Sequence, residues 1–352
     1  MFSNPLRAVL IALVATTSAV PAAAITSLKV AVTGPEAVNG VENLKVIATL
    51  TNTGDETVRL LNDPSSILDT LPADSFTITN DNGATPDFIG AKVKYSPTMA
   101  ATSTDPSAVT IIAPGTSVSF THDLSAAYNF TGAGYGTYTV EPSSLLHVVG
   151  SNGEISEIRP DVEPFVAKIT GGKLAVAHPA VTKRATFNGC SPDQEAALET
   201  AAAGAQSYAR AALDYLRART AATPRYTTWF GDYTSTRHDT VVDHFSKINA
   251  NDFAGFKYDC TCTRSTVYAY VYASDFGTIY LCDVFWRVSQ TGTDSKAGTL
   301  VHEASHFTVN GGTKDYAYGQ SAAKALAVND PDKAVFNADS HEYFAENTPA
   351  QT

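Results

Sequence analysis

The sequence predicts two domains of different class, an N-terminal all-β sandwich and a C-terminal α+β domain that is mostly helical. Three observations support this fold class. The length of 352 residues fits about two domains. The first half consists of short alternating apolar segments separated by Gly, Pro, Asn and Asp, as in β-sandwiches. The second half holds all 4 cysteines and both tryptophans, and it opens with a capped, Ala-rich helix.

The first 24 residues predict a secretory signal peptide. Arg7 is the only charge before an apolar run at positions 8–14, and three alanines at 22–24 fit the small-residue cleavage pattern. An uncleaved membrane anchor is the alternative, but the run is shorter than the ~20 residues that a membrane span needs. We therefore expect a secreted, extracellular protein whose cysteines can oxidise.

The charge balance argues against two classes of partner. Acidic residues outnumber basic ones by 35 to 24, which gives a formal net charge of −11. Phosphate backbones and anionic membranes both require a basic surface. We expect a monomer with neither a nucleic-acid partner nor a membrane partner.

Residues 25–185 form the predicted β-rich domain, and a dibasic pair lies near its end. The expected strands are at 44–50, 58–61, 76–78, 109–112, 118–120 and 135–140. Lys183 and Arg184 lie where the composition changes, which favours a processing site over two solvated linker charges. Cleavage there would separate a propeptide at 25–185 from a mature domain at 186–352.

The C-terminal half opens with a helix signal. Ser191 is a good N-cap, Pro192 takes the first helical position, and Gln194 completes a capping box. This helix is expected to run to about position 219. Further helices are expected at 236–249, from a cap at 293 or 294 to about 308, and at 319–328, 331–336 and 340–347, with a β-hairpin at 267–271 and 277–281.

The four cysteines predict two disulfides. Cys260 and Cys262 are two residues apart, so in an extended segment they share a face and are poorly placed to bond each other. Cys190–Cys260 with Cys262–Cys282 and the crossed pairing both remain open. A zinc finger is a weaker alternative, because it needs two ligand pairs and a reducing compartment.

A metal-binding motif lies on the helix expected near position 300. His302, Glu303 and His306 form HExxH, whose histidines project from one helix face and can bind one zinc ion. Glu303 lies beside them and can reach a water that the zinc activates. The alternative is a pair of ordinary helical histidines beside a salt-bridging glutamate.

A catalytic zinc needs a third protein ligand and an open fourth position. The metzincin pattern fails, because Val309 and Gly312 stand where it requires Gly and His. Glu342 or Glu346 on a later helix could serve, but Asp315 is nearer. Two glycines at 311 and 312 can end the helix with positive φ, and the chain then folds back toward the metal.

These residues carry a specific resemblance. HExxH at 302–306 followed by GTKDxxYG at 312–319 resembles the aspzincin signature of the deuterolysin family, and residues 186–352 resemble its fungal peptidyl-Lys metalloendopeptidase branch. The resemblance implies a secreted zinc endopeptidase with a zincin-like domain, made with an N-terminal propeptide. It implies one zinc ion per chain, held by His302, His306 and Asp315. It also implies the disulfides Cys190–Cys260 and Cys262–Cys282.

The resemblance also implies roles in catalysis. Glu303 would take a proton from the activated water and pass it to the leaving amine. Tyr318 would donate a hydrogen bond to the developing oxyanion, with Tyr316 as the rival donor.

Asp339 and Glu342, three residues apart on the last expected helix, would form a pocket for a substrate lysine. On sequence alone a solvated helix N-terminus is the favoured interpretation, but the resemblance to the peptidyl-Lys branch, which holds lysine with two acids in this stretch, favours the pocket. The substrates would be proteins and peptides cut on the amino side of lysine. His341, between the two acids, is expected to be structural.

Two other functions stay open at this stage. One is a broad-specificity deuterolysin-type zinc protease, and the other is a non-catalytic secreted binding protein with a structural zinc. Residues 25–185 contain no cysteine, so a propeptide there cannot act by a cysteine switch. We expect it to block the cleft sterically and to assist folding.

Overall fold

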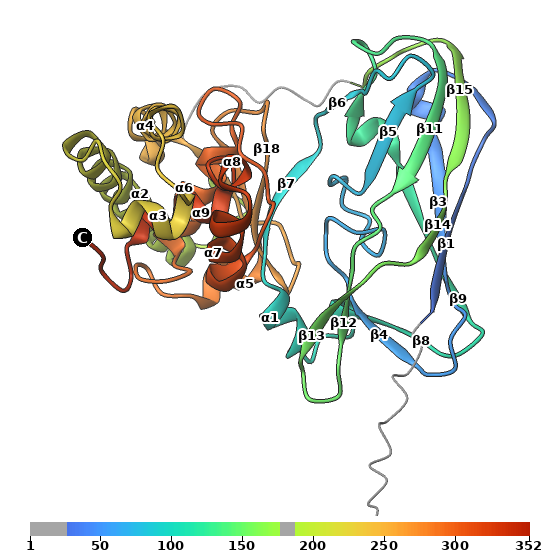
Figure 1. Ribbon diagram of the computed structural model, residues 1–352, viewed down its shortest axis with the longest axis horizontal. Coiled ribbons are helices and arrows are strands. Elements are labelled where there is room, and N and C mark those ends of the chain that lie inside the picture. The colour runs from blue at the N-terminus through green and yellow to red at the C-terminus, as the bar shows by residue number, and fades with distance from the viewer. Residues whose placement is uncertain (1–26, 177–186) are drawn as a thin grey trace, which may run out of the picture.

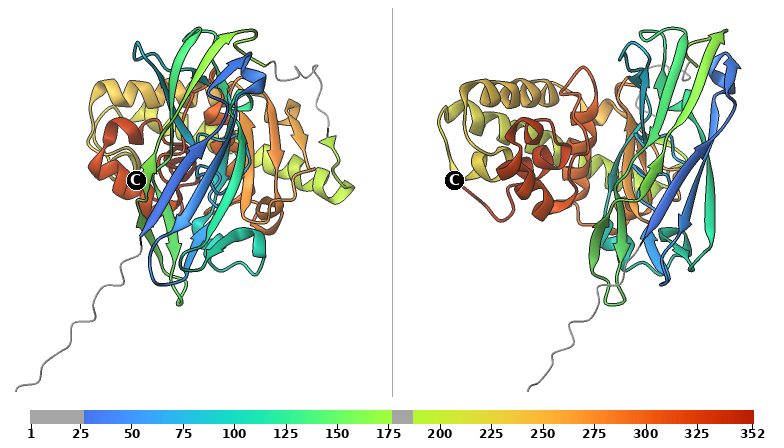
Figure 2. Two further views of the ribbon diagram at one scale, coloured as in Figure 1. Left: turned by 90° about the vertical axis from the view of Figure 1, so that its right-hand side faces the viewer. Right: turned by 45° about the vertical axis from the view of Figure 1, so that its right-hand side comes forward.

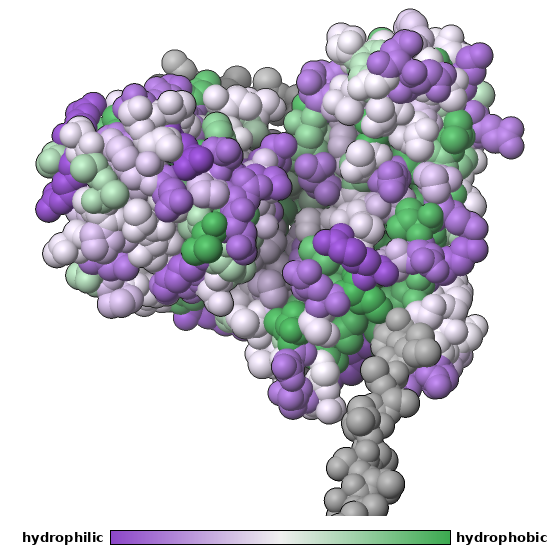
Figure 3. All heavy atoms as spheres, in the orientation of Figure 1, coloured by the Kyte–Doolittle hydropathy of each residue, from purple (hydrophilic) through white to green (hydrophobic). Residues whose placement is uncertain are grey.

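The computed structural model describes residues 27–176 and 187–352. The expected signal peptide and the pair Lys183 and Arg184 lie outside these residues. A sheet-rich N-terminal part stands beside a helical C-terminal part (Figure 1), and Figure 3 shows them as two lobes that meet in the middle of the molecule. The predicted division into a β-rich and a mostly helical half is confirmed at this level.

Two four-stranded sheets share the main apolar core of the N-terminal part. Alternate residues of their strands point inward, as Val30, Leu50, Ile78 and Val140 do, and all four are buried. The first sheet has the order β14 (Asp161–Glu163), β1 (Leu28–Thr33), β3 (Lys45–Asn52) and β9 (Ser117–Asp123). The second has the order β2 (Ala37–Asn39), β15 (Phe165–Gly171), β11 (Gly136–Pro142) and β5 (Phe76–Asn80).

Smaller elements complete the N-terminal part. A third sheet has the order β13 (Ile155–Ile158), β12 (Leu146–Val149), β4 (Val58–Leu61) and β8 (Val109–Ile112). The two-stranded pair is β10 (Tyr128–Asn129) and β6 (Asp87–Phe88). The short helix α1 (Pro97–Ala101) begins at a Ser96 cap. The 3-10 turns are at Val41–Asn43, Pro106–Ala108 and Leu124–Ala126.

The C-terminal part is built from helices around a second core. Helix α2 begins with the predicted capping box of Ser191 and Gln194. The helices are α2 (Pro192–Ala218), α3 (Pro224–Phe230), α4 (Ser235–Asn249), α5 (Asp283–Arg287), α6 (Lys296–His306), α7 (Gly319–Asn329), α8 (Pro331–Ala334) and α9 (Ala338–Glu346), with a 3-10 turn at Phe253–Gly255. Helices α3 and α5 were not expected, because they are too short to show a helical period.

A five-stranded sheet joins the two parts of the chain. Its order is β16 (Phe187–Asn188), β17 (Lys257–Asp259), β19 (Thr278–Leu281), β18 (Val267–Tyr272) and β7 (Ala91–Tyr95). Four strands come from the C-terminal part, but β7 comes from the N-terminal part. It pairs antiparallel with β18, with Val93 opposite Tyr270. Figure 1 labels this strand between the two lobes, and Figure 2 shows the sheet-rich and helical lobes from two further sides.

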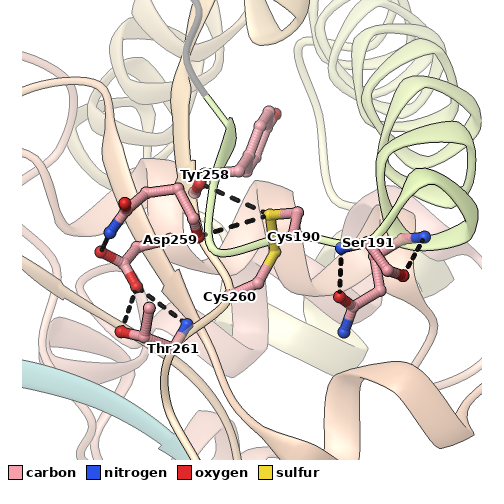
Figure 4. Close-up of a disulfide and its surroundings, with 8 residues drawn as sticks. Cys190, Ser191, Tyr258, Asp259, Cys260 and Thr261 are labelled. Atoms are coloured by element: carbon pink, nitrogen blue, oxygen red, sulfur yellow. Dashed lines mark hydrogen bonds between the residues drawn. A yellow bond between two sulfur atoms is a disulfide. The ribbon is translucent and has the colours of Figure 1, made fainter.

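Both disulfides lie in the C-terminal part. Cys190 bonds Cys260, which ties the start of α2 to the end of β17 (Figure 4). Cys262, two residues after Cys260, bonds Cys282 directly before α5. These are the two pairs that the resemblance implies. Within residues 27–176 and 187–352, no helix is long and apolar enough to cross a membrane.

Candidate metal centre and active site

Helix α6 positions the HExxH residues. His302, Glu303 and His306 are all 0% exposed, because α6 packs between α2, α9 and the sheet. The helix begins after Ser295, whose hydroxyl accepts a hydrogen bond from the Gly298 N–H at 3.0 Å. The expected cap at 293 or 294 is therefore wrong by one or two residues.

The structure brings His302, His306 and Asp315 together. His302 Nε2 lies 3.2 Å from His306 Nε2 and 3.2 Å from Asp315 Oδ1, and the third edge of the triangle measures 3.3 Å. Ligands about 2.0–2.1 Å from a tetrahedral zinc would be roughly 3.3–3.4 Å apart. Asp315 Oδ1 has no hydrogen-bond donor despite its burial. The three atoms therefore have the spacing that would suit one zinc ion.

Neighbouring groups hold both rings with Nε2 toward this centre. His306 Nδ1 donates to the Thr313 carbonyl at 2.9 Å, which fixes the tautomer that leaves Nε2 free for a metal. His302 Nδ1 lies 2.8 Å from Asp339 Oδ1 and 3.3 Å from Glu342 Oε2. The acids predicted for substrate binding thus also orient a predicted metal ligand.

Asp315 reaches the centre because the chain reverses after α6. The helix ends at His306, earlier than the two glycines that were expected to end it. Only one of these glycines, Gly312, has a positive φ, at 58°. Backbone hydrogen bonds from Lys314 N to Phe336 O and from Ala338 N to Lys314 O then tie the returning chain to the start of α9.

Glu303 has the surroundings of a general base. Both of its carboxylate oxygens are buried without a hydrogen-bond partner. Burial is the main cause that raises the pKa of Glu303 to about 8, with a further rise from Asp315. A carboxylate with free lone pairs beside a metal site can accept a proton from water.

Of the two tyrosines, Tyr318 has its hydroxyl bonded to the strand that also contacts Asp315. Its OH donates to the Val93 carbonyl at 3.0 Å, and burial raises its pKa well above the usual value. Tyr316 is 40% exposed, and its ring lies beneath the Lys333 ammonium. The geometry therefore favours Tyr318 as the hydrogen-bond donor.

Asp339 and Glu342 on α9 form a buried acidic pocket rather than a solvated helix end. They are 2% and 0% exposed. The Lys94 ammonium lies 2.6 Å from Glu342 Oε2 and 3.7 Å from Asp339 Oδ1. Burial by itself would lower the pKa of Lys94, but these two acids and Asp294 raise it well above its usual value. The pocket thus accommodates a lysine ammonium.

Glu346, one of the alternative third ligands, has a different position. Its Oε1 accepts hydrogen bonds from the Ser295 N–H at 2.9 Å and from the Ser295 hydroxyl at 2.8 Å. Among the described residues, neither cluster close enough to hold an ion contains Glu346. Its role is to hold the start of α6. Glu342 occurs in the second cluster, which would use His302 Nδ1 in place of the histidine pair.

Sequence reasoning missed the contribution of the N-terminal part to this site. Lys94, Val93 and the strand β7 that carries them lie against the predicted catalytic residues. The alternating Ala91–Tyr95 segment could have indicated a strand. Nothing local in the sequence indicates that this strand joins the sheet of the other half.

Comparison with known proteins shows the family of this chain. A family model described as lysine-specific metallo-endopeptidase, of the aspzincin type, matches residues 215–346. The peptidyl-Lys metalloendopeptidase of Grifola frondosa is 57% identical over 100% of both chains. That of Armillaria mellea is 50% identical over 95% of this chain and 96% of its own. A solved zinc peptidase from Grifola frondosa is 63% identical, covers 46% of this chain and 100% of its own, and superposes with a TM-score of 0.46. The chain belongs to the aspzincin family of lysine-specific metallo-endopeptidases and is a zinc metalloendopeptidase.

Proposed function

We propose that this enzyme is secreted, cuts peptide bonds on the amino side of lysine, and is made as an inactive precursor. The observation that carries the specificity is the buried pair Asp339 and Glu342, which lies beside the predicted metal ligands and holds an ammonium at 2.6 Å. A compact ammonium with three donors suits two converging carboxylates better than a planar guanidinium does. The relatives named peptidyl-Lys metalloendopeptidase support the same specificity.

In this mechanism His302, His306 and Asp315 hold the zinc. When bound, the zinc supplies a Lewis acid that lowers the pKa of water toward 7. Glu303 takes a proton from the attacking water and delivers it to the amine that leaves. The Tyr318 hydroxyl donates to the substrate carbonyl oxygen as negative charge develops on it. The acidic pair fixes the lysine that follows the scissile bond.

The precursor proposal assigns residues 1–24 as signal peptide, 25–185 as propeptide and 186–352 as the mature enzyme, released by cutting at Lys183 and Arg184. Two disulfides in the C-terminal part suit an oxidising, extracellular compartment. The Grifola frondosa relative aligns over its full length, so it has a counterpart of the N-terminal half. We further propose that the enzyme acts as a monomer.

The specificity is tested by digesting a denatured protein with the zinc-loaded, processed enzyme and mapping the cut sites by mass spectrometry. We expect cuts before lysine. The double variant Asp339→Asn/Glu342→Gln should lose this preference, whereas Asp332→Asn, on an exposed carboxylate of α8, should keep it. Cuts distributed over many residue types in the wild-type digest would instead establish a broad-specificity protease.

The catalytic assignment has its own test. Glu303→Gln should bind one zinc per chain, as measured by metal analysis, yet lose nearly all proteolysis, because the amide cannot accept the proton. Asp315→Ala, by contrast, should lose both the zinc and proteolysis. Retention of proteolysis in Glu303→Gln would overturn the assignment of Glu303 as the general base.

A further inference from the structure

Strand β7 of the N-terminal part occupies the edge of the sheet beside the active site. It runs antiparallel to β18, with Lys92, Val93 and Lys94 paired to Val271, Tyr270 and Ala269. Addition of an extended segment to a free sheet edge is a common way to bind peptides, in which the backbone gives affinity and side-chain pockets give specificity. Figure 1 shows β7 reaching across from the N-terminal sheets to β18.

The side chain of Lys94 enters the pocket assigned to substrate lysine. It is 2% exposed, and its ammonium contacts Glu342, Asp339 and, at 3.4 Å, Asp294. The Tyr268 ring lies 4.7 Å from the ammonium and adds a cation–π contact. Burial of a lysine is costly unless the charge is paired, so this set of partners indicates a site built for an ammonium.

The backbone of Val93 contacts the catalytic residues. Its N–H donates to Asp315 Oδ2 at 3.2 Å, and its carbonyl accepts from the Tyr318 hydroxyl at 3.0 Å. Tyr318 therefore touches the carbonyl that directly precedes Lys94. In a substrate cut before lysine, that carbonyl belongs to the scissile bond.

We propose that Lys92–Tyr95 is a built-in substrate mimic, with Lys94 in the lysine pocket and the Val93–Lys94 peptide bond in the position of the bond to be cut. The inference rests on the proposed lysine specificity and deepens it. Inhibition of the precursor is then competitive and specific, because β7 takes both the sheet edge and the acidic pocket that a lysine substrate requires. Steric covering of the active site by the N-terminal sheets is then not the main cause of inhibition.

The first test compares uncut chains spanning residues 25–352, whose integrity is verified by intact mass. Lys94→Met removes the charge at similar length and leaves two buried acids without their cation, so β7 should detach. The control Lys92→Met removes a lysine of the same strand whose ammonium lies over the Phe88 ring instead. With zinc present, Lys94→Met should cleave a short lysyl peptide at least tenfold faster than the wild type, and Lys92→Met should not. Equal rates in the two variants would overturn the proposal.

The second test needs no catalysis. Amine acylation of the metal-free chain, quantified by peptide mass spectrometry, should label Lys94 at least tenfold more slowly than Lys92. In Asp339→Asn/Glu342→Gln, the rate at Lys94 should rise toward that of Lys92. Labelling of both lysines at one rate in the wild type would refute the docking of Lys94. Absence of lysyl cleavage by the processed enzyme, with Lys94 still protected, would instead refute the proposed specificity.

Discussion

A buried pair of neutral histidines should make the helical part sensitive to acid. His341 Nδ1 donates to the Asn337 carbonyl at 2.9 Å, so its Nε2 is free to accept from His244 Nδ1 at 3.1 Å. Aromatic rings of Phe230 and Phe245 pack against His341. Burial lowers the pKa of His244 to about 4 and that of His341 to about 3. Protonation of His341 at Nε2 would remove the acceptor of this hydrogen bond, and protonation of His244 would place a charge in the same buried surroundings.

The sign and size of the effect follow from linkage. Both folded-state pKa values lie below the unfolded value of about 6.5, so the unfolded chain binds more protons as the pH falls through 6.5. The free energy of unfolding has its full value above pH 6.5, and it decreases as the pH falls from 6.5 toward the pKa values of the folded state. At pH 5 each histidine should cost about 2 kcal/mol, since one pKa unit corresponds to about 1.4 kcal/mol. The pair together should cost about 4 kcal/mol relative to pH 7.5.

Urea unfolding of the zinc-free chain between pH 7.5 and 5 measures this dependence. Both tryptophans, Trp229 and Trp286, lie in the C-terminal part, so their fluorescence reports on it. His341→Gln should remove about half of the acid-induced loss that the pair causes. His147→Gln is the control, in β12 of the N-terminal part. The Asp63 carboxylate, 3.5 Å from His147 Nδ1, raises the pKa of His147, so this histidine does not contribute to the acid-induced loss and the variant should retain that loss. The same pH dependence in His341→Gln and in the wild type would refute the reasoning.

Three further predictions concern the site and its supports. Tyr318→Phe in the processed enzyme should lower kcat about 10²-fold because an oxyanion donor is lost; a change in KM alone would contradict this role. Ser295→Ala should cost about 1 kcal/mol in urea unfolding through loss of the α6 cap, and an unchanged midpoint would argue against the cap. Replacing Cys190 and Cys260 by alanine frees a 70-residue loop and should cost about 4 kcal/mol; a cost below ~1 kcal/mol would contradict the loop-entropy argument.

The sequence predicted the parts of the site that local patterns encode. Helical spacing placed His302 and His306 on one face, and the Ser191 capping box marked the start of α2 correctly. The glycine turn also placed Asp315 near the histidines, although α6 ends earlier than expected. Long-range contacts were not predictable in this way. Lys94 lies 248 residues from its partner Glu342, and no local period records such a pairing.

In helix α9, local sequence patterns could not predict the environment of the side chains. The spacing of Asp339 and Glu342 predicted that they share a face, but a solvated end and a buried pocket have the same spacing. Packing against α6 decides between them. The role of Glu346 as the support for Ser295 likewise depends on tertiary contact, since in sequence it resembles a third metal ligand.

The position of Asp339 has a consequence for any attempt to redirect the protease to another residue. Its Oδ1 lies 2.8 Å from a nitrogen of His302 as well as 3.7 Å from the docked ammonium. Groups that support a metal ligand in this manner typically tune metal affinity by about 10–100-fold. Neutralising Asp339 to admit an uncharged side chain should therefore weaken retention of the ion at the same time. On the proposed lysine specificity, recognition and metal loading would be coupled through one carboxylate, so an altered selectivity would require a new partner for the histidine.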